Sequence, residues 1–85
     1  MTLASKYRQY AKPGFALVDG ADADTNIAVT GIKEGDDLLM VLEFATSTND
    51  PTDRSATCSI TSDGNIQCTV ATTSDKLFVC WQSAD

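Results

Sequence analysis

The chain carries few side chains that could do chemistry. Among its 85 residues are three cysteines, Cys58, Cys68 and Cys80, and no histidine. Zinc sites built from Cys and His, histidine acid–base catalysis and Ser-His-Asp triads are therefore excluded. Cys80 has no neighbouring base to activate its thiol, so we interpret it as a packing residue. We expect neither an enzyme nor a bound cofactor or metal.

A cluster of aspartates follows the first apolar segment. Asp19, Asp22 and Asp24 suggest oxygen ligands for calcium. An EF-hand loop also needs a glutamate at its twelfth position, and counting from any of these three residues reaches none. The sequence therefore predicts a solvated, Asp-rich turn instead of a calcium loop.

The composition indicates one globular domain. Hydrophobic residues make up 42% of the chain and charged residues 21%, and twelve acidic residues against six basic give a net charge of −6. A nucleic-acid binder needs a basic face, so we expect no nucleic-acid partner. No run approaches the roughly 20 apolar residues that cross a membrane, and the first residues lack the apolar core of a signal peptide. We expect synthesis in a cytoplasm and no membrane partner.

The densest apolar run, residues 37–45, predicts the strand around which the others are arranged. Alternate side chains of a strand point to opposite faces. The fully apolar face consists of Leu38, Met40, Leu42 and Phe44, and the half-apolar face consists of Leu39, Val41, Glu43 and Ala45. We expect the half-apolar face to form a subunit interface at Leu39 and Val41. A short helix capped by Asp36 or Asp37 is the alternative.

Short apolar segments separated by turn residues predict an all-β domain. The expected strands lie near residues 15–19, 26–32, 37–46, 56–61, 65–71 and 76–82. They would form a small antiparallel β-sandwich or flattened barrel of about six strands. The short turn after Ile32 predicts a hairpin between the second and third strands, and residues 46–55 read as a polar loop. Trp81 is expected in the core or in an interface.

A second hairpin is predicted around Asp63-Gly64. A two-residue turn would put Ile60 and Ile66 on opposite faces, whereas a three-residue loop at 62–64 opposes Ile60 to Ile66 and Cys58 to Cys68. We choose the second register. A disulfide between the two cysteines is sterically strained at that spacing, and the expected compartment is reducing, so we expect two buried free thiols.

The first fourteen residues differ in charge from the rest. Residues 1–14 hold three basic side chains and no acid, and removing this charge of +3 leaves −9 for residues 15–85. We therefore expect an N-terminal basic arm, extended or as a short amphipathic turn, before a single β domain. Charge and amphipathic aromatic area make it the expected attachment segment. Its predicted contact residues are Lys6, Tyr7, Arg8, Tyr10 and Lys12.

From Val18 onward, the order of motifs resembles a class of small proteins encoded beside the major capsid protein genes of tailed bacteriophages. The matching stretches are DGADADTNIAVTGIKEGDDLLMVL, SITSDGNIQ and the closing KLFVCW. In that class, a hairpin with T-G-I and G-D motifs precedes an I-T-S-D/A-G-N-I-Q hairpin, and an aromatic strand ends the chain. The resemblance implies a capsid decoration, or cement, protein that binds the major capsid protein on the outer surface of the shell.

The resemblance also bears on assembly and location. Decoration proteins often occupy three-fold positions between capsomers, and a thin core leaves apolar surface uncovered, so we expect a homotrimer. It implies a virion protein on the capsid outer surface, made in the cytoplasm of the bacterial host. The arm and the cysteines of the second hairpin are outside the matching pattern. A carbohydrate-binding or adhesion module displayed on the virion is the alternative function.

Overall fold

The computed structural model describes residues 13–45 and 51–83, and strands make up most of them. The elements in chain order are β1 (Pro13–Asp19), β2 (Ile27–Ala28), β3 (Asp37–Phe44), β4 (Pro51–Asp53), the 3-10 helix η1 (Ser55–Thr57), β5 (Cys58–Ser62), β6 (Asn65–Cys68) and β7 (Lys76–Gln82). The structure confirms the predicted all-β class, and the run at 37–45 is a strand and not a helix.

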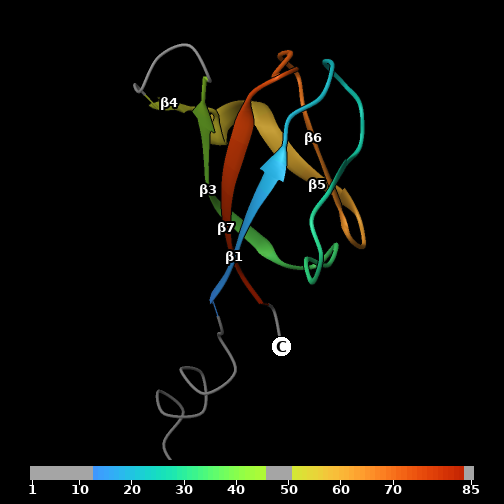
Figure 1. The fold of residues 1–85 in the computed structure, drawn as a ribbon. Coiled ribbons are helices and arrows are strands. Elements are labelled where there is room, and N and C mark those ends of the chain that lie inside the picture. The colour runs from blue at the N-terminus through green and yellow to red at the C-terminus, as the bar shows by residue number, and fades with distance from the viewer. Residues whose placement is uncertain (1–12, 46–50, 84–85) are drawn as a thin grey trace, which may run out of the picture.

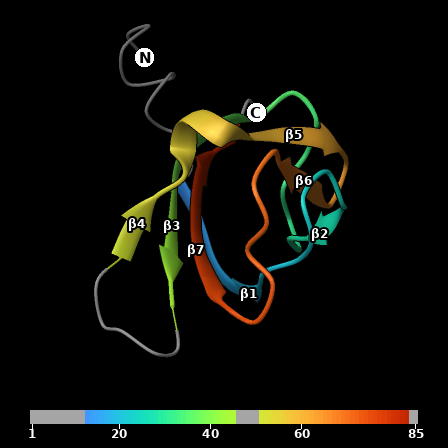
Figure 2. The same cartoon turned by 90° about the horizontal axis from the view of Figure 1, so that it is seen from above.

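Two antiparallel sheets pack face to face (Figure 1). The first sheet has four strands in the order β1-β7-β3-β4, and the second has three in the order β2-β6-β5. Seen from above, the two sheets stand opposite each other as separate layers (Figure 2). The last strand, β7, is therefore an interior strand of the larger sheet, with β1 on one side and β3 on the other.

The core lies between the two sheets. Its buried members come from both layers and from the turns between them: Ile27, Val29, Ile32, Val41, Ile66, Cys68, Leu77, Val79 and Trp81. Trp81 is only 6% exposed, which confirms its predicted place in the core. Gly14 makes room for it, because a Cβ at Gly14 would lie 2.3 Å from an atom of the indole ring. A larger residue at position 14 would displace the indole.

The predicted inner and outer faces of β3 are reversed in the structure. Val41 is fully buried and Glu43 is 7% exposed, so this face looks into the core. The prediction that Val41 forms a subunit interface is therefore wrong, whereas Leu39 is half exposed and its predicted role stays a prediction. A bulge between Leu38 and Met40 interrupts the alternation, and it lets Leu38 pack against the core as well.

The predicted hairpin between residues 26–32 and 37–46 is also wrong. The regular strand in the first segment is only Ile27–Ala28, and it pairs with β6 in the other sheet. The chain leaves it through Gly31, whose φ of 97° is in the left-handed region, and then crosses to β3. Residues 46–55, predicted as a loop, contain the short edge strand β4 and the first residue of the helix η1.

The second hairpin has the chosen register and an unexpected bond. Ile60 lies opposite Ile66 and Cys58 opposite Cys68, while the ladder irregularity falls between Ile60 and Ser62. Gly64, at the end of the turn, has a φ of 80°, in the left-handed region that glycine adopts readily. The two cysteines form a disulfide with Cα atoms 4.1 Å apart, so the expectation of two free thiols is wrong. The prediction assumed a wider separation, and at 4.1 Å between the Cα atoms the two side chains come close enough to bond.

The predicted arm falls almost entirely outside the described residues. The five predicted contact residues in it, Lys6, Tyr7, Arg8, Tyr10 and Lys12, lie there. The β domain begins two residues earlier than expected, because Pro13 and Gly14 open β1 and pair with β7. Proline at the start of an edge strand removes no ladder hydrogen bond that a neighbour needs.

Candidate functional site

The outer face of the four-stranded sheet is apolar and open to solvent. We call it the apolar sheet face, and it consists of Phe15, Leu17, Met40, Leu42, Phe44 and Phe78. Phe15 is 61% exposed, Leu17 66% and Phe44 36%. Monomeric proteins usually cover contiguous apolar surface of this kind, so it marks an interaction site.

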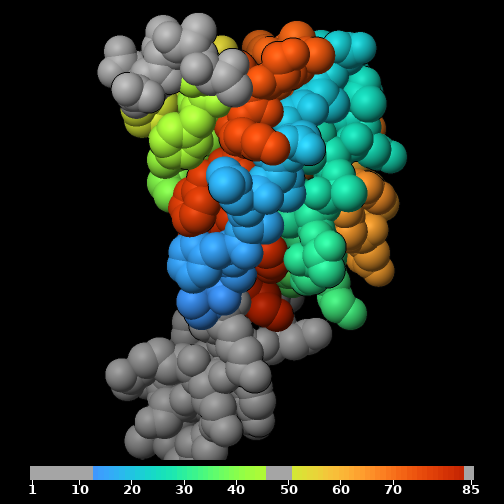
Figure 3. Space-filling view, in the orientation of Figure 1, coloured from blue at the N-terminus to red at the C-terminus, as the bar shows by residue number. Residues whose placement is uncertain are grey.

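Strand register brings these side chains into rows across the sheet. Leu17 of β1 lies opposite Phe78 of β7, which in turn lies opposite Leu42 of β3. The rings of Phe15 and Phe78 stack with their centroids 5.9 Å apart. Figure 3 shows side chains of blue β1, red β7 and yellow-green β3 meeting on one surface. The face thus depends on three strands that are distant in the sequence.

A shallow groove runs over this face. It is lined by Leu17, Leu42, Phe44, Phe78 and Lys76. Lys76 is the single charged residue of the lining, and its ammonium forms an ion pair with Asp19 at the end of β1. With that charge already paired, the groove offers a partner mainly apolar contact.

The outer face of the other sheet is polar. Ser59 and Gln67 lie opposite each other on it, next to Asn26. The Asn26 side-chain oxygen accepts hydrogen bonds from Gln67 Nε2 at 2.8 Å and from Thr61 Oγ1 at 3.3 Å. The sandwich therefore has one apolar and one hydrophilic outer face, and the apolar one is the better candidate for a docking surface.

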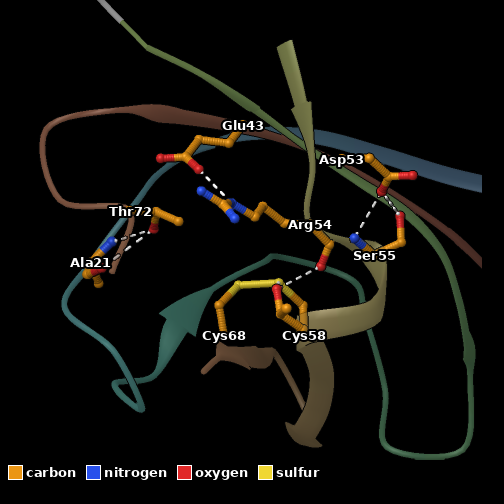
Figure 4. Close-up of polar contacts among 9 residues, drawn as sticks. Ala21, Glu43, Asp53, Arg54, Ser55, Cys58, Cys68 and Thr72 are labelled. Atoms are coloured by element: carbon orange, nitrogen blue, oxygen red, sulfur yellow. Dashed lines mark hydrogen bonds and ion pairs between the residues drawn. A yellow bond between two sulfur atoms is a disulfide. The ribbon is translucent and has the colours of Figure 1, made fainter. Parts of the chain in front are cut away.

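A second group of polar residues holds the β4 edge in place (Figure 4). Arg54 Nε donates to Glu43 Oε1 at 2.7 Å, which neutralises a carboxylate in the core face of β3. Next to it, the Val41 N–H donates to Ser55 Oγ at 3.0 Å, and the Val41 carbonyl accepts from the Arg54 N–H at 2.7 Å. These contacts satisfy an otherwise unpaired part of the β3 edge, so we assign this group a structural role.

Asp53 belongs to the same group, and its neighbours favour the ionised form of its carboxyl group. The Ser55 hydroxyl donates to Asp53 Oδ1 at 2.6 Å, and the Ser55 N–H donates to the same oxygen at 2.9 Å. These two hydrogen bonds, the hydroxyl first, hold the pKa of Asp53 below its ordinary value. An ionised carboxylate keeps accepting both bonds and fixes the entry into η1.

Two aspartates of the predicted Asp-rich turn, Asp19 and Asp22, bind other side chains of the domain. Asp19 pairs with Lys76, and Asp22 Oδ1 accepts a hydrogen bond from Thr73 Oγ1 at 2.6 Å. Beside them, buried Thr72 both accepts from the Ala21 N–H and donates to the Ala21 carbonyl through its hydroxyl (Figure 4). Residues 13–45 and 51–83 contain no group of three or more His, Cys, Asp or Glu side chains placed to hold a metal ion.

The sequence concealed the apolar sheet face because both faces of its strands are apolar. In β1, Phe15 and Leu17 alternate with Ala16 and Val18, so the pattern alone does not say which pair is exposed. The feature of the sequence that points to an exposed apolar face is the excess of apolar residues in three strands, because a small domain has too little core to bury them all. Cys80, read as a packing residue, is 9% exposed.

Comparisons with known proteins give no identification. No protein-family model, no curated protein and no solved structure matches the chain. In residues 13–45 and 51–83, no helix is long and apolar enough to span a membrane.

Proposed function

We propose that the chain is a structural virion protein that decorates the outer surface of a tailed-phage capsid by binding its major capsid protein. The observation that carries the proposal is the apolar sheet face, whose most exposed side chains are Leu17 and Phe15. The resemblance of residues 18–81 to proteins encoded beside capsid genes supplies the partner. On this proposal the protein is made in the host cytoplasm and ends on the virion.

The charge distribution supports a binding role at one face. The described residues hold ten acidic side chains against three basic ones, Lys33, Arg54 and Lys76. Arg54 and Lys76 are already paired with Glu43 and Asp19. An acidic domain of this kind stays soluble while its apolar face remains available, because net charge opposes non-specific association.

A protein partner fits the groove better than a carbohydrate does. Sugar hydroxyl groups lose hydrogen bonds to water when they are buried, and only polar side chains can replace those bonds. The groove is lined by four apolar residues and by Lys76, whose ammonium is paired with Asp19. A carbohydrate would therefore bury hydroxyl groups there without sufficient partners, whereas an apolar protein surface would lose nothing.

Replacing Phe44 tests the proposal. The Phe44→Ser variant should bind undecorated phage heads at least about tenfold more weakly in co-sedimentation, because exposed aromatic anchors dominate binding free energy. Its circular dichroism spectrum should stay that of the wild type, since Phe44 lies outside the core. Ser59→Ala on the polar face is the matched control and should bind normally. Unchanged binding by Phe44→Ser would remove the apolar sheet face from the attachment surface.

Deleting residues 2–12 tests the predicted role of the basic arm. The truncated protein should retain the β-sheet circular dichroism spectrum, because the described core contains none of these residues. Its binding to heads should weaken and lose much of its dependence on salt, since three basic side chains are removed. Equal binding by the truncated and intact proteins at every salt concentration would leave the apolar sheet face as the sole attachment surface.

A further inference from the structure

We propose that two copies of this protein pair edge to edge through β1, which joins their four-stranded sheets into one continuous sheet. The inference starts from the position of β1 at the end of the strand order β1-β7-β3-β4. An edge strand presents a row of unpaired N–H and C=O groups to any strand that can lie beside it. The pairing involves Phe15 and Leu17, which also belong to the apolar sheet face, and it gives a two-fold pair in place of the homotrimer expected from the sequence.

The alternation of hydrogen bonds along β1 shows which of its N–H and C=O groups bond to β7 and which point away from it. The Gly20 N–H donates to the Asp75 carbonyl at 2.9 Å, at the end of the β1–β7 ladder. Bonded and non-bonded pairs alternate along an antiparallel ladder, so the even-numbered residues of β1 bond to β7. The groups that point away from β7 belong to Phe15, Leu17 and Asp19. Within residues 13–45 and 51–83, no backbone hydrogen bond reaches them from that side.

The far side of the same sheet verifies this phase. If the odd-numbered residues of β7 face β1, its even-numbered residues face β3, and Val41 must point away from β7. Its N–H does so, donating to Ser55 Oγ, and its carbonyl accepts from the Arg54 N–H. The β4 side of the sheet is thus occupied. On the β1 side, β2 lies near β1, but within residues 13–45 and 51–83 no backbone hydrogen bond joins the two strands.

β1 lacks the short length and the ladder irregularity that block edge pairing elsewhere in the molecule, although it too begins with a proline, Pro13. β2 has two residues, β4 has three and begins with Pro51, and β5 carries a register irregularity before Ser62. Short length, proline and bulges are devices that block strand addition. β1, in contrast, runs for seven residues without an irregularity and has no charge before Asp19.

The β1 sequence is compatible with a second copy of itself in a defined register. Centred on Ala16, a two-fold pair places Phe15 opposite Leu17 of the second copy and Asp19 opposite Pro13 of the second copy. The odd-numbered residues then bond to each other, with about six hydrogen bonds between the copies because proline has no N–H. No two like charges face each other in this register, and Asp19 is already paired with Lys76.

The pairing also brings the most exposed apolar side chains of the two copies side by side. Among the large hydrophobic residues that the structure describes, Leu17 and Phe15 have the largest exposed fractions, 66% and 61%, and both lie on β1. In the two-fold pair, Phe15 of one copy lies next to Leu17 of the second copy on the outer face, within cross-strand contact distance. Backbone hydrogen bonding and apolar contact therefore both favour β1 of a second copy as the strand that pairs with the open edge of β1.

Amide hydrogen exchange measured by NMR over a range of protein concentrations tests the pairing. The Ala16 and Val18 amides bond to β7 and should be protected at every concentration, which provides an internal control. The Phe15, Leu17 and Asp19 amides should become protected only as the concentration rises, in step with a doubling of mass in light scattering. A monomer at all concentrations, or a trimer in which these amides still exchange rapidly, overturns the proposal.

Two substitutions test the edge directly. Leu17→Pro removes an N–H that points away from β7, and it should weaken self-association at least about tenfold. Phe15→Lys adds a charge to the same edge without restricting the backbone, and it covers the case in which the proline variant does not fold. Ser59→Lys adds the same charge on β5 and should self-associate like the wild type. Wild-type self-association by a folded Phe15→Lys variant also overturns the proposal.

Discussion

Reducing the Cys58–Cys68 disulfide should lower the free energy of unfolding by about 2–3 kcal/mol, the size expected for closing a short loop. The bond joins residues ten positions apart, at the end of the second hairpin remote from its turn. That hairpin makes up most of the three-stranded sheet, because the third strand, β2, has two residues. Without the bond, the open end of the hairpin is held only by its ladder and by packing.

Urea unfolding with and without a reductant measures this effect through the fluorescence of buried Trp81. Reduction breaks the S–S bond and adds one hydrogen to each sulfur while leaving every other core atom in place, so the difference reports the cross-link. The control is the Cys58→Ala/Cys68→Ala double variant, whose unfolding midpoint should not respond to the reductant. This control also shows that free Cys80 plays no part in the response. An identical midpoint for oxidised and reduced wild type would show that sheet packing alone holds the hairpin.

Strands with a clear apolar signal and turn residues at their ends could be predicted from the sequence. β7 was predicted at its observed bounds, and the second hairpin was predicted in its observed register. β4 was missed because an edge strand that is exposed along its length, such as Pro51–Asp53, leaves no apolar pattern. β2 was assigned to the wrong partner because the choice depends on Gly31, whose left-handed turn is a feature of tertiary context.

The failures at the candidate site have one physical cause. When both faces of a strand are apolar, period-two alternation gives the two faces but not which of them is buried. Glu43 would have been expected outside, yet Arg54 pairs with it and keeps it in the core face. The disulfide differs from the prediction for another reason. Strain at the expected spacing and a reducing compartment both favour free thiols, whereas Cys58 and Cys68 lie closer together than expected, with Cα atoms 4.1 Å apart.

Replacing Arg54 with methionine should destabilise the protein by about 2 kcal/mol, because it leaves the Glu43 carboxylate buried without its partner. The Glu43 side chain is 8% exposed and the Arg54 side chain 30%, so water replaces the lost ion pair poorly. Methionine keeps most of the apolar stem that covers the β4 edge. The backbone hydrogen bond from Arg54 to Val41 does not depend on the side chain and should persist.

A double-mutant cycle separates the ion pair from its surroundings. Glu43→Gln in the Arg54→Met background should recover a large part of the lost stability, since a neutral amide costs less to bury than a carboxylate. The exposed pair Lys76–Asp19 is the matched control, with exposed fractions of 53% and 80%. Lys76→Met should change the unfolding free energy by less than about 1 kcal/mol, because water screens exposed ion pairs. A coupling free energy between Glu43 and Arg54 as small as this control value would contradict the prediction. It would mean that Arg54 stabilises the protein through its apolar stem and that water, in place of Arg54, solvates the Glu43 carboxylate.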